Sequence, residues 1–398
     1  MIAKKENTKY QGSLLSTEGF FDSIDKIDPE FFVLHPISNV FLNAEYFRSI
    51  ERAGFQGLSF RYYLHPLKDG SFQFQYFQLL DLSTRDLESI VNLDPYGKVL
   101  TGLSGVLDKF IFGIQRNKPH YLVICGNMLM SGNHGLYCGS GNHQALLETI
   151  TKVKQDLSKS GKVAAMIVKD FEADRDALGP LLKKDKFHSM IMDPIMEMDL
   201  APSWKSFSDY LAAMSSKYRV RTNNVRKKLA DTSIKQLSLA DVEEHYDRLE
   251  FLYKSVQQKS PIRLMQCSFL YLKNLMMYMP DKLVMEAYIE NGEIIAFLCG
   301  IKNGKSLEAH HIGIDYKYNK SHALYQNILY DFIEMGIQES MNHVSFGRTA
   351  MEMKSTVGAV PVTYNAYIRF ENRVVNSLIC HFLPDEPAGD WVQRNPFK

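Results

Sequence analysis

The stretch SLEAHHIG, residues 306–313, places a carboxylate and two imidazoles close together on a predicted β-strand. Successive side chains of a strand point to opposite faces, so Glu308 and His310 are expected to share one face and His311 to take the other. A carboxylate beside an imidazole suits general acid–base chemistry, with one group accepting a proton and the other orienting it. The competing interpretation is that one histidine is a satisfied core residue and the other is solvated.

Two more candidate catalytic residues follow this strand. Asp315 comes just past the strand end, where a meander can present polar groups to a ligand, and Tyr325 lies at the start of the next predicted helix. A tyrosine there could protonate a departing thiolate, although a lone helical tyrosine more often packs through its ring.

The stretch SFGRTAMEMKSTVGA, residues 345–359, is rich in residues that bind anions. Gly347 permits a positive φ, Arg348 offers a planar fork for carboxylate or phosphate, and Lys354 adds a movable point charge. Two cations flanking Glu352 predict a site for an anionic substrate or donor group. The alternative is that Arg348 pairs with Glu352 inside the loop and that Lys354 is solvated.

Residues 206–232 carry many cations and are predicted to form one long helix. Its apolar stripe is formed by Leu211, Met214, Tyr218, Val225 and Leu229. Lys217 and Arg221 belong to a basic run that can guide a phosphate-bearing donor, a tRNA acceptor end or an anionic lipid headgroup. A solvated helix face is the competing interpretation.

The elements that must position these residues are clearest between residues 283 and 345. Two Asn-Gly pairs, at 291/292 and 303/304, separate three apolar segments and predict a three-stranded antiparallel meander. The following segment, 321–340, has apolar residues at helical spacing, and a further strand, HVSFG, comes next. This order predicts an α+β unit built on a mixed, mostly antiparallel sheet flanked by helices.

The first half of the chain shows a less clear version of the same pattern. Residues 60–82 indicate a strand, an Asp-Gly turn and a strand, and helices are expected near 103–116 and 142–158. We interpret this as a distant structural repeat. Pro194 and the segment APSW at 201–204 mark the junction, which predicts domains 1–197 and 198–398.

The amino-acid composition excludes several classes of binding partner. With 46 Lys and Arg against 45 Asp and Glu in 398 residues, the chain is not expected to coat nucleic acid, and no DNA partner is predicted. The five cysteines form no CxxC pair, and His134 and His143 lack metal-ligand spacing, so no metal is expected. No apolar run approaches the roughly 18 residues of a membrane span. We expect a cytoplasmic protein, with peripheral contact at the inner membrane face left open.

The sequence resembles GNAT-superfamily acyltransferases of the tandem-domain, Fem-like type, a group that includes proteins of peptidoglycan biosynthesis and recognition. Three stretches carry the resemblance: SSKYRVRTNNVRKKL, the meander LVMEAYIENGEIIAFLCGIKNGKSLEAHHIGID, and SFGRTAMEMKSTVGA. The similarity extends over most of the chain. It implies two tandem GNAT-like domains and transfer of an acyl group to an amine.

The resemblance gives the candidate residues their roles. It implies an N-acyltransferase that moves an acyl group from a thioester of CoA or acyl-carrier protein to a primary amine of a small molecule or amino lipid. The candidate catalytic residues are then Glu308, His310, Asp315 and Tyr325, and the candidate substrate-binding residues are Arg348, Glu352, Lys354, His311, Lys217 and Arg221. Two alternatives stay open: a Fem-like peptidyltransferase that uses aminoacyl-tRNA in cell-wall synthesis, and a noncatalytic ligand-binding module.

The sequence departs from acetyl-CoA-dependent relatives at one place. Those proteins carry a glycine-rich pyrophosphate loop after the last meander strand, whereas this chain reads DYKYNKSHALY with no glycine after Gly313. Backbone amides at the helix start, with Lys317, Lys320 and Ser321, are the expected anion site for the donor. Acyl-CoA, acyl-carrier protein and aminoacyl-tRNA therefore all remain as donors.

Overall fold

A computed structural model of the chain describes residues 19–67, 71–84, 118–138, 144–172, 177–259, 267–379 and 391–398. The helix expected near 103–116 and the side chain of His143 lie outside these ranges. None of the helices in the described ranges is both long enough and apolar enough to cross a bilayer.

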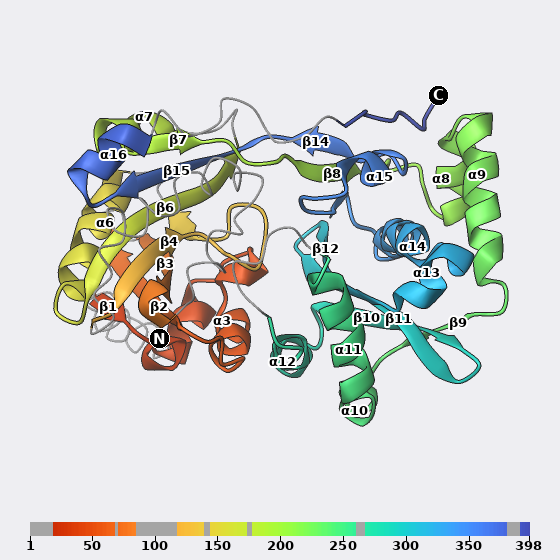
Figure 1. Ribbon diagram of the computed structural model, residues 1–398, viewed down its shortest axis with the longest axis horizontal. Coiled ribbons are helices and arrows are strands. Elements are labelled where there is room, and N and C mark those ends of the chain that lie inside the picture. The colour runs from red at the N-terminus through yellow and green to blue at the C-terminus, as the bar shows by residue number, and fades with distance from the viewer. Residues whose placement is uncertain are drawn as a thin grey trace, which may run out of the picture. The chain divides into compact units, whose positions relative to one another are not determined.

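Internal contacts divide the chain into two compact units, which Figure 1 shows as two sheets with their own helices. Unit 1 comprises Met1–Met192 and Tyr364–Pro387, and unit 2 comprises Asp193–Thr363 and Ala388–Lys398. The predicted α+β class with two tandem GNAT-like domains is confirmed. The predicted division at 197/198 lies close to the first boundary of the units, but it placed β15 and α16, residues 364–379, in the second domain, whereas these elements belong to unit 1.

Unit 1 is built on a mixed sheet. Its strands are β1 (Gly19–Phe21), β2 (Leu58–Pro66), β3 (Phe72–Asp81), β4 (His120–Cys125), β5 (Leu136–Cys138), β6 (Lys162–Glu172), β7 (His188–Met190) and β15 (Tyr364–Phe370). Its helices are η1 (Ile24–Lys26), α2 (Pro29–Leu34), η2 (Val40–Leu42), α3 (Ala44–Glu51), η3 (Leu82–Thr84), α6 (Gln144–Leu157), α7 (Gly179–Lys184) and α16 (Arg373–Ile379). The strand order is β1-β2-β3-β4-β6-β15-β7, with β5 beside β3. Among these described strands, only β4 and β6 pair in parallel.

The two faces of the unit 1 sheet have different covers. On one face, Phe77 and Leu79 of β3 pack in a core with Ile150 and Val153 of α6. On the other face, Phe47 of α3 contacts the rings of neighbouring strands in an aromatic core. The alternation of side chains along β3 therefore supplies both cores at once.

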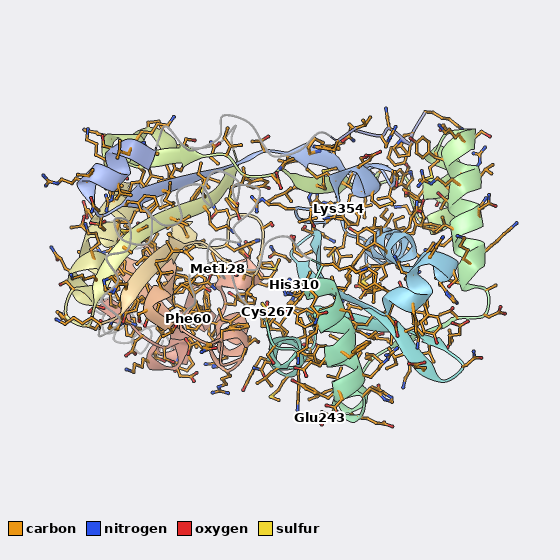
Figure 2. All side chains as sticks on the ribbon, in the orientation of Figure 1. Phe60, Met128, Glu243, Cys267, His310 and Lys354 are labelled. Carbon is orange, nitrogen blue, oxygen red and sulfur yellow. The ribbon has the colours of Figure 1, made fainter. Side chains whose placement is uncertain are left out.

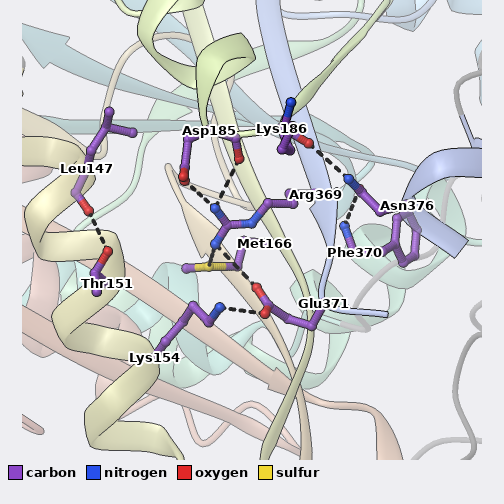
Figure 3. Close-up of polar contacts among 10 residues, drawn as sticks. All are labelled: Leu147, Thr151, Lys154, Met166, Asp185, Lys186, Arg369, Phe370, Glu371 and Asn376. Carbon is purple, nitrogen blue, oxygen red and sulfur yellow. Dashed lines mark hydrogen bonds and ion pairs between the residues drawn. The ribbon is translucent and has the colours of Figure 1, made fainter. Parts of the chain in front are cut away.

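Strand β15 is fixed in unit 1 by Arg369, whose polar contacts are drawn in Figure 3. The guanidinium pairs with Asp185, donates to Glu371 Oε1 at 3.2 Å, and lies over the ring of Phe187 at 4.6 Å. Lys154 of α6 pairs with the other oxygen of Glu371 at 2.5 Å. These contacts, together with antiparallel pairing to β6 and β7, anchor a late segment of the chain among early elements.

Unit 2 is a second mixed sheet. Its strands are β8 (Ile195–Asp199), β9 (Ser233–Gln236), β10 (Leu283–Glu290), β11 (Glu293–Asn303), β12 (Ser306–Ile314), β13 (His343–Ser345) and β14 (Val360–Val362). Its helices are α8 (Phe207–Ala213), α9 (Ser216–Arg226), η5 (Lys227–Leu229), α10 (Leu239–Glu244), α11 (Tyr246–Gln257), α12 (Leu270–Tyr278), α13 (Tyr316–His322), α14 (Leu324–Gln338) and α15 (Met351–Ser355). The strand order is β14-β8-β13-β12-β11-β10-β9.

The predicted meander forms β10, β11 and β12, and Gly292 and Gly304 take the positive φ that its two turns require. The predicted helix after it forms α14, which packs its apolar residues on one face of this sheet. Helices α11 and α12 cover the other face, where Phe269 contacts Phe297 of β11. The sheet is thus enclosed on both faces, as the α+β class predicts.

The single long helix predicted over 206–232 is wrong. The chain forms α8, then an extended residue at Met214, then α9. Met214 makes an antiparallel bridge with Phe397, and the Ser215 amide donates to the Pro396 carbonyl at 2.9 Å. Pairing with the C-terminal residues therefore replaces the helical bonds at this point, while the predicted stripe still contacts the core.

Candidate functional site

The candidate site lies where two parallel strands of unit 2 stop pairing. Strands β12 and β13 pair at three positions, the last of which is Glu308 with Ser345. Strand β13 then ends, whereas β12 continues to Ile314. We call this point the β12–β13 split. Backbone groups of β12 beyond Glu308 have no β13 partner, so the split leaves polar backbone and side chains available at a strand end.

Glu308 is the buried acid of the split. Its side chain is 8% exposed and accepts a hydrogen bond from Ser306 Oγ at 2.9 Å. Burial raises the pKa of its carboxyl to about 7, although hydrogen bonds from Ser306 and Ser345 act in the opposite direction. The carboxyl therefore changes protonation close to neutral pH, as a general base at that pH requires.

A charged histidine lies beside Glu308 on the neighbouring strand. His343 Nδ1 is 3.0 Å from Asp199 Oδ1, and its Nε2 is 3.3 Å from Glu197 Oε2. Burial lowers the pKa of His343, but its bonds to Glu197 and Asp199 prevail and raise that pKa to about 9. The imidazolium favours the ionised form of Glu308, whereas Glu197 disfavours it.

Lys354 is the buried base next to the split. Its ammonium is drawn into its own loop, where it donates to the Gly347 carbonyl at 3.1 Å and to the Arg348 carbonyl at 2.5 Å. The side chain is 4% exposed, and burial lowers its pKa to about 7. The third N–H of the charged form has no partner among the described residues. A movable surface cation was expected here, but the structure holds Lys354 in a fixed position.

The other two residues of the Gly-Arg stretch point elsewhere. Arg348 Nε donates to the Asp193 carbonyl at 2.7 Å, and Glu352 pairs with Arg394 instead of Arg348. Gly347 has a φ of +67°, as expected, and Thr349 and Ala350 also take left-handed conformations. Side chains other than glycine seldom adopt this backbone, so the turn between β13 and α15 is strained. A helix, α15, replaces the predicted loop.

A β-bulge on β12 places both histidines on one face. Cys299 pairs with His311 and Gly300 with Ala309, so His310 is the additional residue. Figure 2 labels His310 near the end of α11. The two imidazole rings lie 4.0 Å apart, and both contact Tyr271 of α12. The prediction that His311 faces the other side is therefore wrong, because the bulge interrupts the alternation.

The two histidines differ in chemistry. His310 Nε2 and the Tyr271 hydroxyl are hydrogen-bonded at 2.8 Å. Burial lowers the pKa of His311 to about 4, so this ring is neutral at physiological pH. A neutral His311 does not supply the charge that binding an anionic substrate would use.

The expected donor site after β12 is occupied by acidic groups. Asp315 accepts the Lys317 amide as the N-cap of α13, and Arg248 bonds Asp315 at 2.9 Å. Lys317 Nζ lies 3.6 Å from Asp315, and Ser321 Oγ donates to the Tyr318 carbonyl. Lys320 is exposed. The Asp315 carboxylate at the start of α13, a helix of seven residues, would repel a phosphate bound there. These contacts therefore do not favour the predicted anion site.

The catalytic roles predicted for Asp315 and Tyr325 receive no support from these contacts. Asp315 is engaged by Arg248 and by the start of α13. Tyr325 is the second residue of α14, and burial raises the pKa of its hydroxyl above the ordinary value. A proton is therefore harder to remove from Tyr325 than from a solvated tyrosine.

The basic run on α9 has one half-buried arginine and several exposed cations. Arg226 pairs with Asp331 and Glu334 of α14 and lies over the ring of Phe207. Lys217 and Arg221 are exposed. Sequence inspection did not separate Arg226 from its neighbours, because its acidic partners lie far along the chain.

Sequence inspection also missed two residues of the split, Ser345 and Tyr271. Ser345 lies inside the predicted strand HVSFG, and a serine within a strand marks a site only when the partner strand is known. Tyr271 was one of many aromatic residues in a predicted helix. Within the described ranges, no group of three or more His, Cys, Asp or Glu side chains is placed to hold a metal ion.

Unit 1 has a related but closed arrangement. Its parallel strands β4 and β6 last pair at Cys125 and Val168, and Lys169 then donates to the carbonyls of Asn127 and Met130. Unlike Lys354, Lys169 also forms a buried ion pair with a carboxylate, that of Asp170, at 2.5 Å. The corresponding point of unit 1 is therefore filled by a charge pair of the protein.

Comparison with known structures agrees with this architecture. FemX aligns over 94% of this chain and 98% of its own, with 9% identity and a TM-score of 0.51. A tandem GNAT protein from the clavulanic acid biosynthesis pathway aligns over 89% and 98%, with 8% identity and a TM-score of 0.50. A protein of unknown function from Bacteroides thetaiotaomicron aligns over 88% and 99%, with 12% identity and a TM-score of 0.50. At these identities the likeness shows the fold alone.

Sequence comparison gives the family. No curated protein matches the chain significantly. The FemAB_like family, described as peptidoglycan biosynthesis/recognition, matches residues 182–394, which is more than half of the chain. The match includes the β12–β13 split and the basic helix α9. The chain therefore belongs to the FemAB_like family.

Proposed function

We propose that the chain is an N-acyltransferase that moves an acyl group from an activated carboxyl donor to a primary amine at the β12–β13 split of unit 2. The observation that carries this proposal is the buried Glu308 carboxyl, whose pKa of about 7 suits it to accept a proton from an amine. Family membership and the tandem GNAT-like fold support the same class of reaction. The charge pair in unit 1 favours unit 2 as the catalytic unit.

The reaction is an exchange of bonds at one carbonyl carbon. Glu308 accepts a proton from the acceptor ammonium, and the freed nitrogen attacks the donor carbonyl to form the C–N bond. The oxygen gains negative charge, which the remaining N–H of the Lys354 ammonium stabilises. The C–S bond of a thioester, or the C–O bond of an ester, then breaks. The leaving group takes a proton, so that an amide and a thiol or alcohol are the products.

This division of roles predicts a narrow pH optimum. Glu308 must be ionised, so the rate rises as pH increases through about 7. Lys354 must be charged, so the rate falls as pH increases beyond about 7. The expected profile of kcat/KM is a bell with its maximum near neutral pH.

A direct assay tests the proposal. The full chain is incubated with acetyl-CoA or palmitoyl-CoA and dodecylamine, and the amide product is measured by mass spectrometry. Glu308→Gln is expected to lower kcat/KM by about 10²-fold or more, since it removes the base. The matched control is Glu339→Gln, an exposed residue at the end of α14 that pairs with Lys302. Wild-type activity equal to that of Glu308→Gln would exclude Glu308 as the base.

Aminoacyl-tRNA is the second candidate donor, and the surface of α9 favours it. Lys217, Arg221, Lys227 and Lys228 are exposed on this helix and its 3-10 extension, and the start of α13 does not favour a pyrophosphate. If tRNA is the donor, transfer from charged tRNA falls steeply with salt and in a Lys217→Gln, Arg221→Gln, Lys227→Gln variant. Transfer from acyl-CoA by the same variant stays at the wild-type rate. If the chain turns over neither an acyl-CoA nor a charged tRNA, both versions of the proposed N-acyltransferase are wrong.

A further inference from the structure

Residues 391–398 form a segment of unit 2 that has no helix of its own and passes α15 (Figure 1). Phe397 forms a bridge with Met214, and the Lys398 amide donates to the Ala213 carbonyl at 3.4 Å. The segment is therefore fixed at the end of α8. It also contacts α15 and the residues that follow this helix. We call residues 391–398 the α15 strap.

The α15 strap makes polar contacts at several points along α15 and beyond it. The Arg394 amide donates to Ser355 Oγ at 3.0 Å, and the Arg394 guanidinium pairs with Glu352. Gln393 Nε2 donates to the Ala359 carbonyl at 3.1 Å. The strap therefore holds both the helix and the residues between it and β14.

Phe397 supplies the apolar part of the strap. Its ring centroid lies 5.7 Å from that of Trp204 and 5.9 Å from that of Tyr210. The ring also lies against the backbone of Gly358, where an added Cβ would be 2.4 Å from a ring carbon. Tyr210 in turn donates to the Val357 carbonyl at 2.8 Å. Because aromatic contacts of this kind bury a large area, Phe397 is expected to be the main anchor of the strap.

Lys354 lies within the stretch that the strap holds. Its ammonium donates to carbonyls of the turn before α15, so the ammonium keeps these bonds only while α15 stays against that turn. Burial lowers the pKa of Lys354 to about 7. The charged groups on and around α15 are engaged with other partners: Glu352 with Arg394, Arg348 with the Asp193 carbonyl, and Glu197 of β8 with His343.

We propose that Phe397 is a positioning residue for Lys354: by anchoring the α15 strap, it keeps the Lys354 ammonium buried next to the β12–β13 split. The inference rests on the role in acyl transfer that is proposed above for Lys354. Without the ring, α15 is free to move away from the turn before it, and water reaches the ammonium. A lysine that gains water returns toward its ordinary pKa, because the cost of burying its charge is removed.

A measurement that needs no activity tests the strap. Folded Lys354 has a lower pKa than unfolded Lys354, so the wild type is expected to become more stable as the pH rises from 7 to 10. The urea midpoints of the full chain at these two pH values measure this gain. In Phe397→Ala, hydration of Lys354 is expected to reduce the gain to about half or less. A purely structural role of Phe397 would lower the midpoint equally at both pH values.

Three further variants complete the comparison. Leu237→Ala removes a buried side chain of unit 2 outside the strap, so it should lower both midpoints and keep the wild-type gain. Val392→Ala changes an exposed residue of the strap and should behave as the wild type does. Phe397→Leu keeps an apolar side chain without the ring, and its gain should lie between those of the wild type and Phe397→Ala. It replaces the alanine variant if that protein does not fold.

Kinetics test the connection to catalysis. In the acyltransferase assay, Phe397→Ala is expected to lower kcat/KM at pH 7 by about tenfold or more, because the N–H that stabilises the oxyanion is displaced. The high-pH limb of the profile should move up by about one pH unit or more, since a hydrated Lys354 stays charged at higher pH. Leu237→Ala should leave this limb where the wild type has it.

Three results overturn the proposal. They are an equal gain in midpoint for the wild type and Phe397→Ala or Phe397→Leu, an equally reduced gain in Leu237→Ala, and an unchanged high-pH limb in an active Phe397→Ala or Phe397→Leu variant. If the wild type has no activity but Phe397→Ala reduces the gain, the positioning of Lys354 by the strap is supported and the proposed function is wrong.

Discussion

Two buried titratable residues, Glu308 and Lys354, dominate the chemistry of the β12–β13 split. Burial shifts the pKa of each residue so that its neutral form is favoured. The pKa of Glu308 rises to about 7, and that of Lys354 falls to about 7. Glu308 and Lys354 form no ion pair with each other in the described contacts. Glu308 is hydrogen-bonded to a serine hydroxyl, and Lys354 to backbone carbonyls. Burial of an uncompensated charge destabilises a fold, so such residues are common where chemistry needs them.

Lys354 should make the stability of the protein depend on pH. Its pKa is 10.5 unfolded and about 7 folded, so the unfolded state binds the additional proton between these values. Stability from this residue is therefore highest above pH 10.5 and falls as pH decreases to about 7. Replacing Lys354 by Met removes this dependence, which amounts to at most about 1.4 kcal/mol per pH unit.

Urea denaturation at several pH values between 7 and 10 measures this effect. Lys305→Met is the control, since Lys305 also donates to a backbone carbonyl, that of Ser340, but is exposed. Identical pH dependence in the wild type and Lys354→Met would show that Lys354 keeps an ordinary pKa.

At the scale of elements, strand β12 holds the site through two local departures from a regular strand. The bulge at His310 presents both histidines to α11 and α12. Three residues later, Gly313 allows α11 to approach the strand closely. A Cβ at Gly313 would lie 2.8 Å from Leu252 Cβ and would overlap the ring of Phe297. The strand therefore positions the site only because this residue has no side chain.

Gly313→Ala is expected to lower the free energy of unfolding by about 2–3 kcal/mol, because neither Phe297 nor the backbone of α11 can move away without loss of packing. Gly304→Ala is the matched comparison: its positive φ is strained by a side chain, but a Cβ there meets nothing within 4 Å. It should lower the free energy of unfolding by about 1 kcal/mol. Denaturant melts of both variants measure the two losses in the free energy of unfolding. A larger loss for Gly304→Ala than for Gly313→Ala would contradict the close approach of α11 to β12 at Gly313.

At the scale of the whole molecule, the chain enters unit 2 at residue 193 and returns to unit 1 at residue 364. Strand β15 then fills the position between β6 and β7. Unit 1 therefore lacks an interior strand until nearly the whole chain has been made. The pairing of Arg369 with Asp185 joins two residues that lie 184 positions apart in the chain.

Arg369→Ala is expected to weaken unit 1 without weakening the meander of unit 2. Removing the guanidinium leaves Asp185 without its partner and Glu371 with Lys154 alone, which should cost about 1–3 kcal/mol. Hydrogen exchange with mass spectrometry should show faster exchange in β6, β7 and β15, and unchanged exchange in β10–β12. The control is Arg373→Ala, an exposed arginine of α16. Equal acceleration in both units would mean that they unfold together.

The sequence by itself determined the elements whose signals are local. The Asn-Gly turns and the helical spacing in α14 involve neighbouring residues, and the meander and helix form where they were predicted. Fold class and family followed from the same stretches. The sequence also identified Glu308 as a candidate catalytic residue, because it lies on a predicted strand whose alternation gives the face that its side chain takes.

Only the tertiary structure decided the features that depend on residues far apart in the chain. The helix over 206–232 breaks at Met214 because Phe397 bridges to it, and both histidines face α12 because the extra residue opposes the Cys299–Gly300 step of β11. Lys354 is buried because the turn after β13 folds back over its ammonium. The physical reason is common to all of them: a backbone or side-chain polar group takes the best partner in space, and sequence patterns report only partners close along the chain.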